Sequence, residues 1–313
     1  MSEWKTLDDT YVATTYKRFP VEIVRGEGSL VYDADGRRYI DMGSGIGVTA
    51  FGHADPEWVA AVTAQLTKVS HTSNLYYTEP CARLAALLCE RTGLRRVFFG
   101  NSGAEANECA IKVARKYAAE KRGLEDAVIV TLKNSFHGRT LTTLAATGQD
   151  HFHKLFRPLT PGFVHAGAND LEEMTSILDS YPVAAVLLEC VQGEGGVIAL
   201  CGDYLRALEK LLRERDVLLM IDEGFLAAVK RKSERIRAAL EDAKGIRSVS
   251  GLGLMIGIET VRPAAEVVAD CMASGVLCLT AKHKVRLLPP LNIDDALLDE
   301  ALALIIEACA KGV

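Results

Sequence analysis

The chain has 313 residues, of which 49% are hydrophobic and 25% charged, and its formal net charge is −5. These values are typical of a globular protein large enough for two domains, and they give no basis for a nucleic-acid partner or an acidic membrane surface. The longest apolar runs have the length of a strand, so we expect no membrane span, and the N-terminus has no apolar signal core.

The eight cysteines are scattered, without a CxxC pair or a Cys/His cluster at the spacing of a zinc site. Several lie within apolar segments, where cysteine behaves as a small buried hydrophobe. We therefore expect no bound metal and a reduced, cytoplasmic setting.

Three regions follow one another along the chain. Residues 1–45 contain short strand-like runs with Asp-Gly turns, which predict a small antiparallel meander. In residues 46–223, apolar strands alternate with amphipathic helices, which is typical of an α/β fold with a mostly parallel sheet covered on both faces. Residues 224–313 predict a smaller α+β domain, against which we expect the meander to pack. The predicted strands of the large domain are 95–100, 126–132, 162–167, 183–189 and 217–223.

A helix N-terminus after the first of these strands could bind an anion. Residues 100–108, GNSGAEANE, place small residues where the free N–H groups of a new helix attract phosphate. Ser102 either adds a hydroxyl to such a site or simply caps the helix, and the residues alone leave both readings open.

Further polar residues follow the next strands. In NSFHGRT, residues 134–140, Arg139 suits bidentate binding of a carboxylate and Phe136 can stack on a flat cofactor, although a plain surface loop fits too. Glu189 and Asp222 end buried strands, where a carboxylate either holds a protonated ring nitrogen or caps a helix. All these groups fall at the carboxyl ends of strands that we predict to be parallel, where open α/β sheets bind ligands.

Six motifs together resemble one family. They occur in the order found in the class III, pyridoxal-phosphate-dependent aminotransferases of fold type I, and two N-terminal stretches resemble more narrowly the acetylornithine aminotransferases. This resemblance implies transfer of an amino group from N2-acetyl-L-ornithine to 2-oxoglutarate in arginine biosynthesis, by a homodimer. Succinylornithine, ornithine and 4-aminobutyrate are alternative donors. The motifs are SGAEANE, FHGRT, ECVQGEGG, MIDE, GLGLMIGIE and VRLLPPL, with YKRFPVEIV and SHTSNLYYTEP at the N-terminal side.

The resemblance also implies roles for cofactor-binding residues. Ser102, Gly103 and Ala104 would cup the phosphate of pyridoxal phosphate. Phe136 would stack on its ring with His137 beside it, and Asp222 would pair with the ring nitrogen to keep it protonated.

Substrate contacts are implied in the same way. Arg139 would contact the acylated donor, and Arg286 would bind the α-carboxylate of 2-oxoglutarate or glutamate. Glu194 resembles the carboxylate that screens this arginine in related ornithine enzymes. Tyr16 is a further residue on the substrate side.

In VLLMIDEGFLAAVKRK, residues 217–232, a predicted strand passes directly into a basic amphipathic helix without a binding loop, and here, after Glu223, the chain departs from the family. Family members continue there with a segment that supplies the Schiff-base lysine and a threonine loop for the partner subunit's phosphate, and this chain is roughly eighty residues shorter. The resemblance therefore implies no catalytic lysine and, at best, non-covalent binding of the cofactor. None of the remaining lysines is expected to substitute. Lys230 and Lys232 are expected on a solvated face of a basic helix, and the others considered are Lys112, Lys133 and Lys282.

Two consequences follow from this departure. The resemblance places two absent strands between the strand at 97–100 and the strand at 217–221, and we predict that Val97–Gly100 closes the gap by pairing with Val217–Ile221. For function, three alternatives are open: an active enzyme of which this chain is an incomplete part, a deletion variant that binds the cofactor weakly, or an inactive partner subunit.

Overall fold

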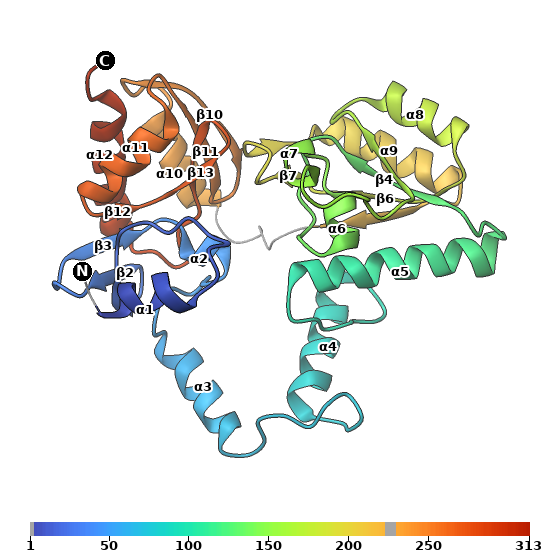
Figure 1. The fold of residues 1–313 in the computed structure, drawn as a ribbon, viewed down its shortest axis with the longest axis horizontal. Helices are drawn as coiled ribbons and strands as arrows, with labels where there is room; N and C mark the ends of the chain where they lie inside the picture. The colour runs from blue at the N-terminus through green and yellow to red at the C-terminus, as the bar shows by residue number, and fades with distance from the viewer. Residues whose placement is uncertain (1–2, 223–229) are drawn as a thin grey trace. The chain divides into compact units, whose positions relative to one another are not determined.

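The computed structural model describes residues 3–222 and 230–313. The chain divides into two compact units (Figure 1): unit 1 comprises Met1–Thr63, Ala227–Val249 and Ile258–Val313, and unit 2 comprises Ala64–Leu226 and Ser250–Gly257. Residues 46–63, which the sequence assigned to the large domain, thus group with unit 1. The expected direct passage from a strand into a helix after Asp222 lies outside the described residues.

A parallel sheet forms the centre of unit 2. Its strands are short apolar runs that lie in the order β5 (Phe163–Ala166), β4 (Val128–Leu132), β6 (Val183–Leu188) and β9 (Leu218–Ile221). Each neighbouring pair is parallel. All six residues of β6 are buried, as expected for a central strand covered on both faces.

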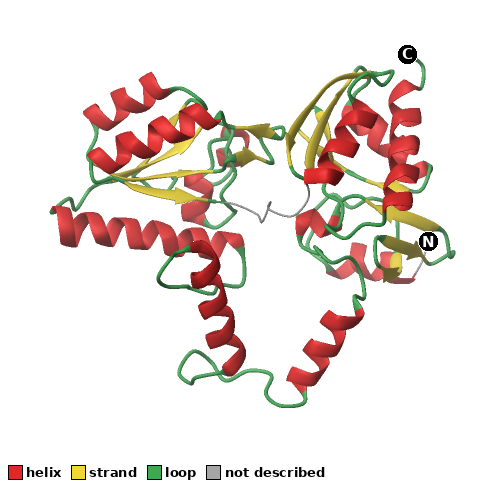
Figure 2. Cartoon of the chain, turned by 180° about the vertical axis from the view of Figure 1, so that it is seen from behind, coloured by secondary structure: helices red, strands yellow, loops and turns green. Residues whose placement is uncertain are grey.

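Helices cover both faces of this sheet (Figures 1 and 2). On one face, α8 (Leu171–Ser180) and α9 (Gly202–Glu214) bury an apolar stripe that includes Met174, Leu208 and Leu212. On the other face, α5 (Gly103–Arg122) contributes Ile111, Ala114 and Ala118 to a second apolar cluster. The α/β class predicted from the alternation of strands and helices is confirmed.

Shorter elements complete unit 2. β7 (Val191–Gln192) and β8 (Ile198–Ala199) form a small antiparallel hairpin after β6. Helices α6 (Leu141–Ala146) and α7 (Asp150–His153) follow β4. Helix α4 (Glu79–Thr92) precedes α5 and buries none of its residues within the chain.

The predicted pairing of Val97–Gly100 with Val217–Ile221 is wrong. Residues 96–100 have no strand structure, and β9 ends the sheet, with β6 as its single partner among the residues that the structure describes. If two strands are absent between residues 97–100 and β9, these two segments lie three strand spacings apart. At about 4.8 Å per spacing, the distance is about 14 Å. Helix α5 begins directly after this segment and is held on β4 and β6 by its buried residues, so residues 97–100 cannot move across that distance.

The chain has two further four-stranded sheets; the first belongs to unit 1, and the second is formed mostly by unit 1 but includes residues 250–257, which belong to unit 2. The N-terminal meander is antiparallel, and β3 also pairs in parallel with β12, which joins the first 45 residues to the C-terminal part of the chain. The first sheet has the order β1 (Ile23–Glu27), β2 (Leu30–Asp33), β3 (Arg38–Asp41), β12 (Val276–Leu277). The second has the order β10 (Ile246–Leu252), β11 (Met255–Thr260), β14 (Lys284–Leu287), β13 (Leu279–Ala281).

The helices of unit 1 pack around these sheets. Three are long and C-terminal: α10 (Lys230–Leu240), α11 (Ala264–Ala273) and α12 (Asp295–Ala310). Two are N-terminal: α1 (Glu3–Tyr11) and the short α2 (Ser44–Gly47). Helix α3 (Pro56–Leu66) runs across the boundary of the two units. No helix within residues 3–222 and 230–313 is both long and apolar enough to cross a membrane.

Replacement of Leu208 by alanine is expected to destabilise unit 2. Leu208 is fully buried between α9 and the sheet, so its truncation should cost about 2–5 kcal/mol of unfolding free energy. Urea unfolding followed by circular dichroism measures the loss. Leu155→Ala is the matched control, because Leu155 is 88% exposed and its loss should cost less than about 0.5 kcal/mol. Equal effects of the two substitutions would contradict this packing.

Candidate cofactor site

The polar residues of unit 2 meet at the carboxyl edge of the sheet. The loop of residues 134–140 follows β4, Glu189 follows β6 and Asp222 follows β9. The strands are parallel and neighbouring, so their carboxyl ends lie side by side. The Asp222 amide still donates to the Leu188 carbonyl (2.8 Å), which fixes this carboxylate at the end of the ladder.

The Asp222 carboxylate is held by two side chains from other elements. Its Oδ2 atom accepts a hydrogen bond from Asn107 Nδ2 (2.8 Å) and lies 2.9 Å from His137 Nδ1. Asn107 also donates to the His137 carbonyl (2.9 Å), so the three residues form a closed network. Among the described residues, both hydrogen bonds to the Asp222 carboxylate are made to Oδ2, so Oδ1 remains able to accept one from a ligand.

His137 is buried, and its second ring nitrogen has a distinct environment. With Nδ1 turned towards Asp222, Nε2 has no hydrogen-bond partner among the described residues although it is inaccessible. A buried polar atom without a partner is costly, and such atoms are concentrated at functional sites. The imidazole thus orients Asp222 and keeps one polar atom for another partner.

The N-terminus of α5 is capped by its own side chains. Ser102 Oγ accepts a hydrogen bond from the Glu105 amide (3.2 Å), so the capping role left open by the sequence is present. The Glu105 carboxylate in turn accepts from the Asn101 amide. The amides of Gly103 and Ala104 belong to the first turn, which has no intrahelical acceptors for them, and open space surrounds the Gly103 Cα. These two amides are available to an anion.

At Gly138, the backbone of the loop after β4 lies close to the first turn of α5. A Cβ at Gly138 would lie 2.7 Å from the Ala104 Cβ and 2.6 Å from Thr143 Oγ1, and its φ is +131°. Only glycine fits this position without a shift of α5 or α6. The first turn of α5, His137 and Asp222 therefore lie in one candidate site.

Glu189 is a buried carboxyl that supports the same loop. One oxygen accepts from the Phe136 amide (3.0 Å) and the other from the Gly193 amide (3.3 Å). Burial raises the pKa of Glu189 to about 8, against the lowering effect of the Phe136 hydrogen bond and with further raising by the nearby Asp222 charge. At neutral pH the protonated form is favoured, so Glu189 limits the negative charge beside Asp222.

The expected substrate residues are divided between the units. In unit 2, the exposed Arg139 lies with its guanidinium 5.9 Å from the centre of the Phe136 ring, and Glu194 is partly buried in the turn after β7. In unit 1, Arg286 is buried in β14 opposite Leu279, whereas Tyr16 is exposed. The structure brings together Ala104, Phe136, His137 and Asp222 but leaves Arg286 and Tyr16 in the other unit.

Several lysines have structural partners. Lys133 forms an ion pair with Glu173 (2.7 Å). Lys232 was expected to lie on a solvated helix face, but its ammonium donates to the carbonyls of Leu291 (3.1 Å) and Ile293 (2.6 Å), and burial lowers its pKa. The expectation that Lys232 lies on a solvated helix face is therefore wrong, because its ammonium binds two carbonyls of the loop after β14.

The sequence reasoning missed Asn107. The buried residues of α5 are Asn107, Ile111, Ala114 and Ala118, spaced at intervals of four, three and four. A polar residue on the buried stripe of a helix requires a partner, so this spacing carried a readable signal.

Glu189→Gln should change how stability depends on pH. The folded-state pKa of about 8 lies above the unfolded value of 4.5, so the folded protein binds more protons between these values. The wild type should therefore lose stability relative to the variant as the pH rises through this range, and the difference should level off above it. Urea midpoints measured across this range provide the test; a pH-independent difference would contradict the buried carboxyl.

Comparisons with known proteins extend over almost the whole chain. The acetylornithine aminotransferase of Haemophilus ducreyi is 41% identical over 386 aligned positions, which cover 98% of this chain and 98% of the relative. That of Caldanaerobacter subterraneus is 33% identical over 389 positions, covering 98% and 99%. Since the chain has 313 residues, an alignment of 386 positions contains at least 73 at which the relative has a residue and this chain has none.

Solved structures are similar in fold. The ornithine aminotransferase of Toxoplasma gondii ME49 has a TM-score of 0.89 at 24% identity and covers 98% of this chain and 94% of its own. The N-acetylornithine aminotransferase of Stenotrophomonas maltophilia has a TM-score of 0.81 at 28% identity, covering 97% and 98%. The model of the class III aminotransferase family matches residues 11–225 and 223–309. This chain belongs to the class III aminotransferases, a pyridoxal-phosphate-dependent family of fold type I.

Proposed function

We propose that this chain is an acetylornithine-aminotransferase-type protein that binds pyridoxal phosphate non-covalently and does not complete transamination by itself. The observation that carries this proposal is the break in the family match at residues 223–225. The break follows Asp222 directly, while the cofactor residues before it are held in one network. An internal deletion after Glu223, which removes the lysine implied by the family, accounts for both features.

The residues present fit the cofactor. The Gly103 and Ala104 amides at the N-terminus of α5 would hold its phosphate, because the helix dipole and the free N–H groups favour an anion. Asp222 Oδ1 would accept from the protonated ring nitrogen, while Asn107 and His137 keep the carboxylate in place. When bound, pyridoxal phosphate supplies an electron-withdrawing ring. Phe136 would cover a face of that ring.

The proposed loss of activity concerns proton transfer. The family resemblance implies a lysine that both attaches the cofactor and moves the proton during amino-group transfer. Lys133 and Lys232 have structural partners, and neither replaces it. The proposal is therefore that the described residues bind and orient the cofactor, while neither Lys133 nor Lys232 supplies an amine that moves this proton.

Substrate choice follows the same family. The donor proposed is N2-acetyl-L-ornithine and the acceptor is 2-oxoglutarate, supported by the acetylornithine aminotransferases to which the chain is similar. Arg139, Glu194, Arg286 and Tyr16 are the residues proposed to contact them. Succinylornithine, ornithine and 4-aminobutyrate remain alternative donors, and the cytoplasm is the proposed location.

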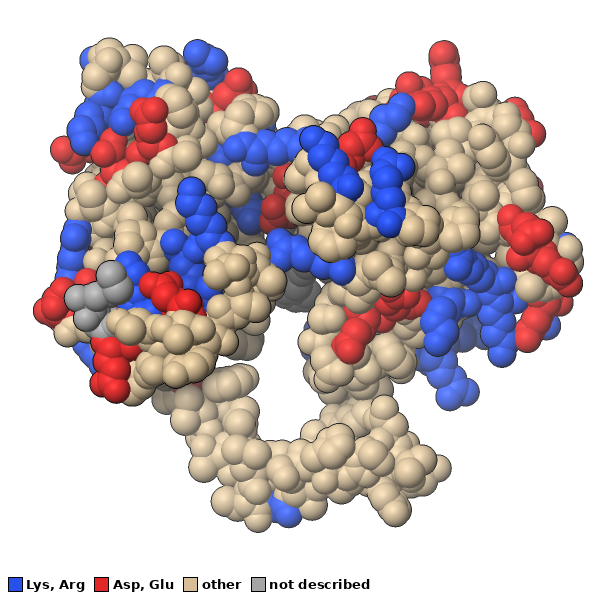
Figure 3. Space-filling view, viewed as in Figure 1, with Lys and Arg blue, Asp and Glu red and all other residues tan. Residues whose placement is uncertain are grey.

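A homodimer is proposed from the exposed apolar surface. Side chains on α3 and on the loop that follows it are exposed although they are large and apolar, and few charged side chains interrupt them at the bottom of Figure 3. Contiguous exposed apolar surface is typical of a protein–protein interface. The residues concerned in unit 2 are Leu66, Val69, Leu75, Tyr76 and Tyr77.

The intact mass decides between a real deletion and an incomplete chain. A mass of 33.9 kDa corresponds to the 313 residues. At this mass we expect no cofactor attached after borohydride reduction and no measurable turnover of acetylornithine with 2-oxoglutarate. A mass greater by roughly 8–9 kDa, at about 110 Da per residue for roughly eighty residues, would instead identify an ordinary aminotransferase that contains the lysine.

Asp222→Ala should weaken cofactor binding. Loss of a hydrogen bond to a charged group costs about 1.5–3 kcal/mol, which corresponds to a roughly tenfold to 150-fold higher Kd. Titration of pyridoxal phosphate followed by its absorbance measures this effect. Asp203→Ala is the control, since Asp203 is exposed on α9. An unchanged Kd in the Asp222 variant would show that Asp222 does not bind the ring nitrogen of the cofactor.

A further inference from the structure

The outer edge of β9 is open. β9 pairs with β6 along one edge, and no other strand in the described part of the chain pairs with it. The Asp222 amide points towards β6, so the alternation of a strand directs the Leu219 and Ile221 amides to the opposite edge. All four residues of β9 remain partly or largely exposed, and Ile221 is 53% exposed. Such an edge is a template for another strand.

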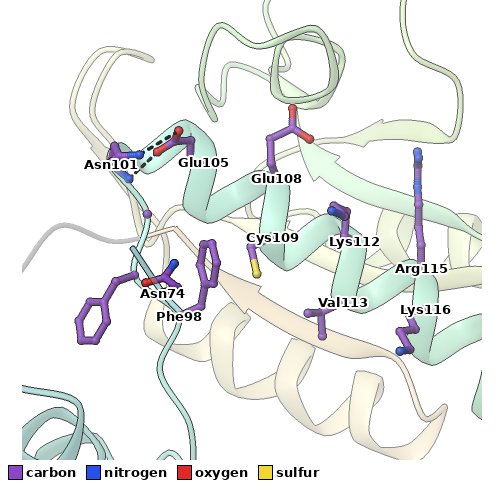
Figure 4. A pocket seen from close by; sticks show the side chains of 12 residues that line it. Asn74, Phe98, Asn101, Glu105, Glu108, Cys109, Lys112, Val113, Arg115 and Lys116 are labelled. Atoms are coloured by element: carbon purple, nitrogen blue, oxygen red, sulfur yellow. Dashed lines mark hydrogen bonds between the residues drawn. The ribbon is translucent and has the colours of Figure 1, made fainter. Parts of the chain in front are cut away.

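A groove lies along the outer surface of α5, the helix that packs on β9. It has a volume of about 760 Å³ and extends between residues 98–101 and the exposed face of α5. Figure 4 shows Phe98 and Asn74 on one side of it and Cys109, Lys112 and Val113 along the helix on the other. Phe98 and Val113 are 59% and 57% exposed. The walls therefore present apolar surface that no described part of the chain covers.

Helix α5 holds this groove next to β9. Leu218 and Met220 of β9 pack on the apolar cluster that contains Ile111 and Ala114 of α5. At the start of the strand, the Tyr117 hydroxyl donates to Asp216 Oδ1 (2.9 Å). The open edge and the exposed helix face are thus fixed to each other.

We propose that the open edge of β9 and this groove bind an extended apolar segment of a separate polypeptide, which adds to the sheet as a strand beside β9. The occupant proposed is the segment that relatives carry at the break. Three observations favour it: at least 73 positions of a relative have no counterpart here, the break follows β9 directly, and the edge left by that break is open. Main-chain hydrogen bonds to the Leu219 and Ile221 positions would provide affinity, and the groove would receive alternate side chains.

The test uses a recombinant, fluorescein-labelled segment of the Haemophilus ducreyi acetylornithine aminotransferase that aligns with the gap after Glu223. Titration with the full 313-residue chain should give a saturable rise in anisotropy. Hydrogen exchange of the Leu219 and Ile221 amides should slow at least tenfold in the complex. Absence of saturable binding, or binding without protection of these amides, would overturn the proposal.

Two matched variants locate the binding. Val113→Glu places a charge on the helix wall of the groove at an exposed position, so the variant should fold and its affinity for the segment should fall at least tenfold. Leu155→Glu, at an exposed position elsewhere in unit 2, should bind as the wild type does. If β9 is instead protected by self-association, protection would rise with protein concentration without the segment, and a second copy would replace the proposed occupant.

This inference stands apart from the proposed function. Cofactor binding is measured on the chain alone, whereas docking is measured without cofactor. A chain that binds the segment but not pyridoxal phosphate would refute the proposed function only. A chain that binds pyridoxal phosphate but not the segment would refute only the proposed binding of a strand beside β9.

Discussion

The parallel pairing of β6 with β9 is the constraint on which the candidate site depends. It places Asp222 one residue beyond the end of the ladder, with its amide still bound to the Leu188 carbonyl. From there the carboxylate reaches Asn107 on α5 and His137 in the loop after β4. Three elements distant in the sequence therefore converge because two strands share a register. Without that register, the N-terminus of α5 and the Asp222 carboxylate would not belong to one candidate site.

The same strand also limits the fold. β9 pairs with β6 along one edge, and no described residue pairs with its other edge, so Asp222 follows a strand at the edge of this sheet. Local stability is lowest where few apolar contacts and unpaired backbone groups coincide. The candidate site and the exposed edge thus involve the same strand, β9, which directly precedes the break in the family match.

The sequence predicted those features that depend on local pattern. Alternating apolar strands and amphipathic helices indicated the parallel sheet, and strand ends pointed to Asp222 and the 134–140 loop. It failed for residues 97–100, whose apolar run has the composition of a strand but no partner within reach. Strand pairing is a tertiary property, and α5 fixes where this segment lies. Asn107 was missed because its partners, Asp222 and the His137 carbonyl, lie 115 and 30 residues further along the chain. Lys232 likewise binds carbonyls about sixty residues away.

Glu189 explains how the site tolerates several carboxylates. Asp222 and Glu194 are both close enough to raise its pKa, and burial has the largest effect. A protonated Glu189 keeps its contact with the Phe136 amide while it adds no charge, so the charge at the end of the sheet concentrates on Asp222. Asp222 also has hydrogen-bond donors on two sides. A carboxylate at this position, together with the positive helix-dipole potential at α5, is the pattern that a ligand with a phosphate at one end and a cationic ring nitrogen at the other requires.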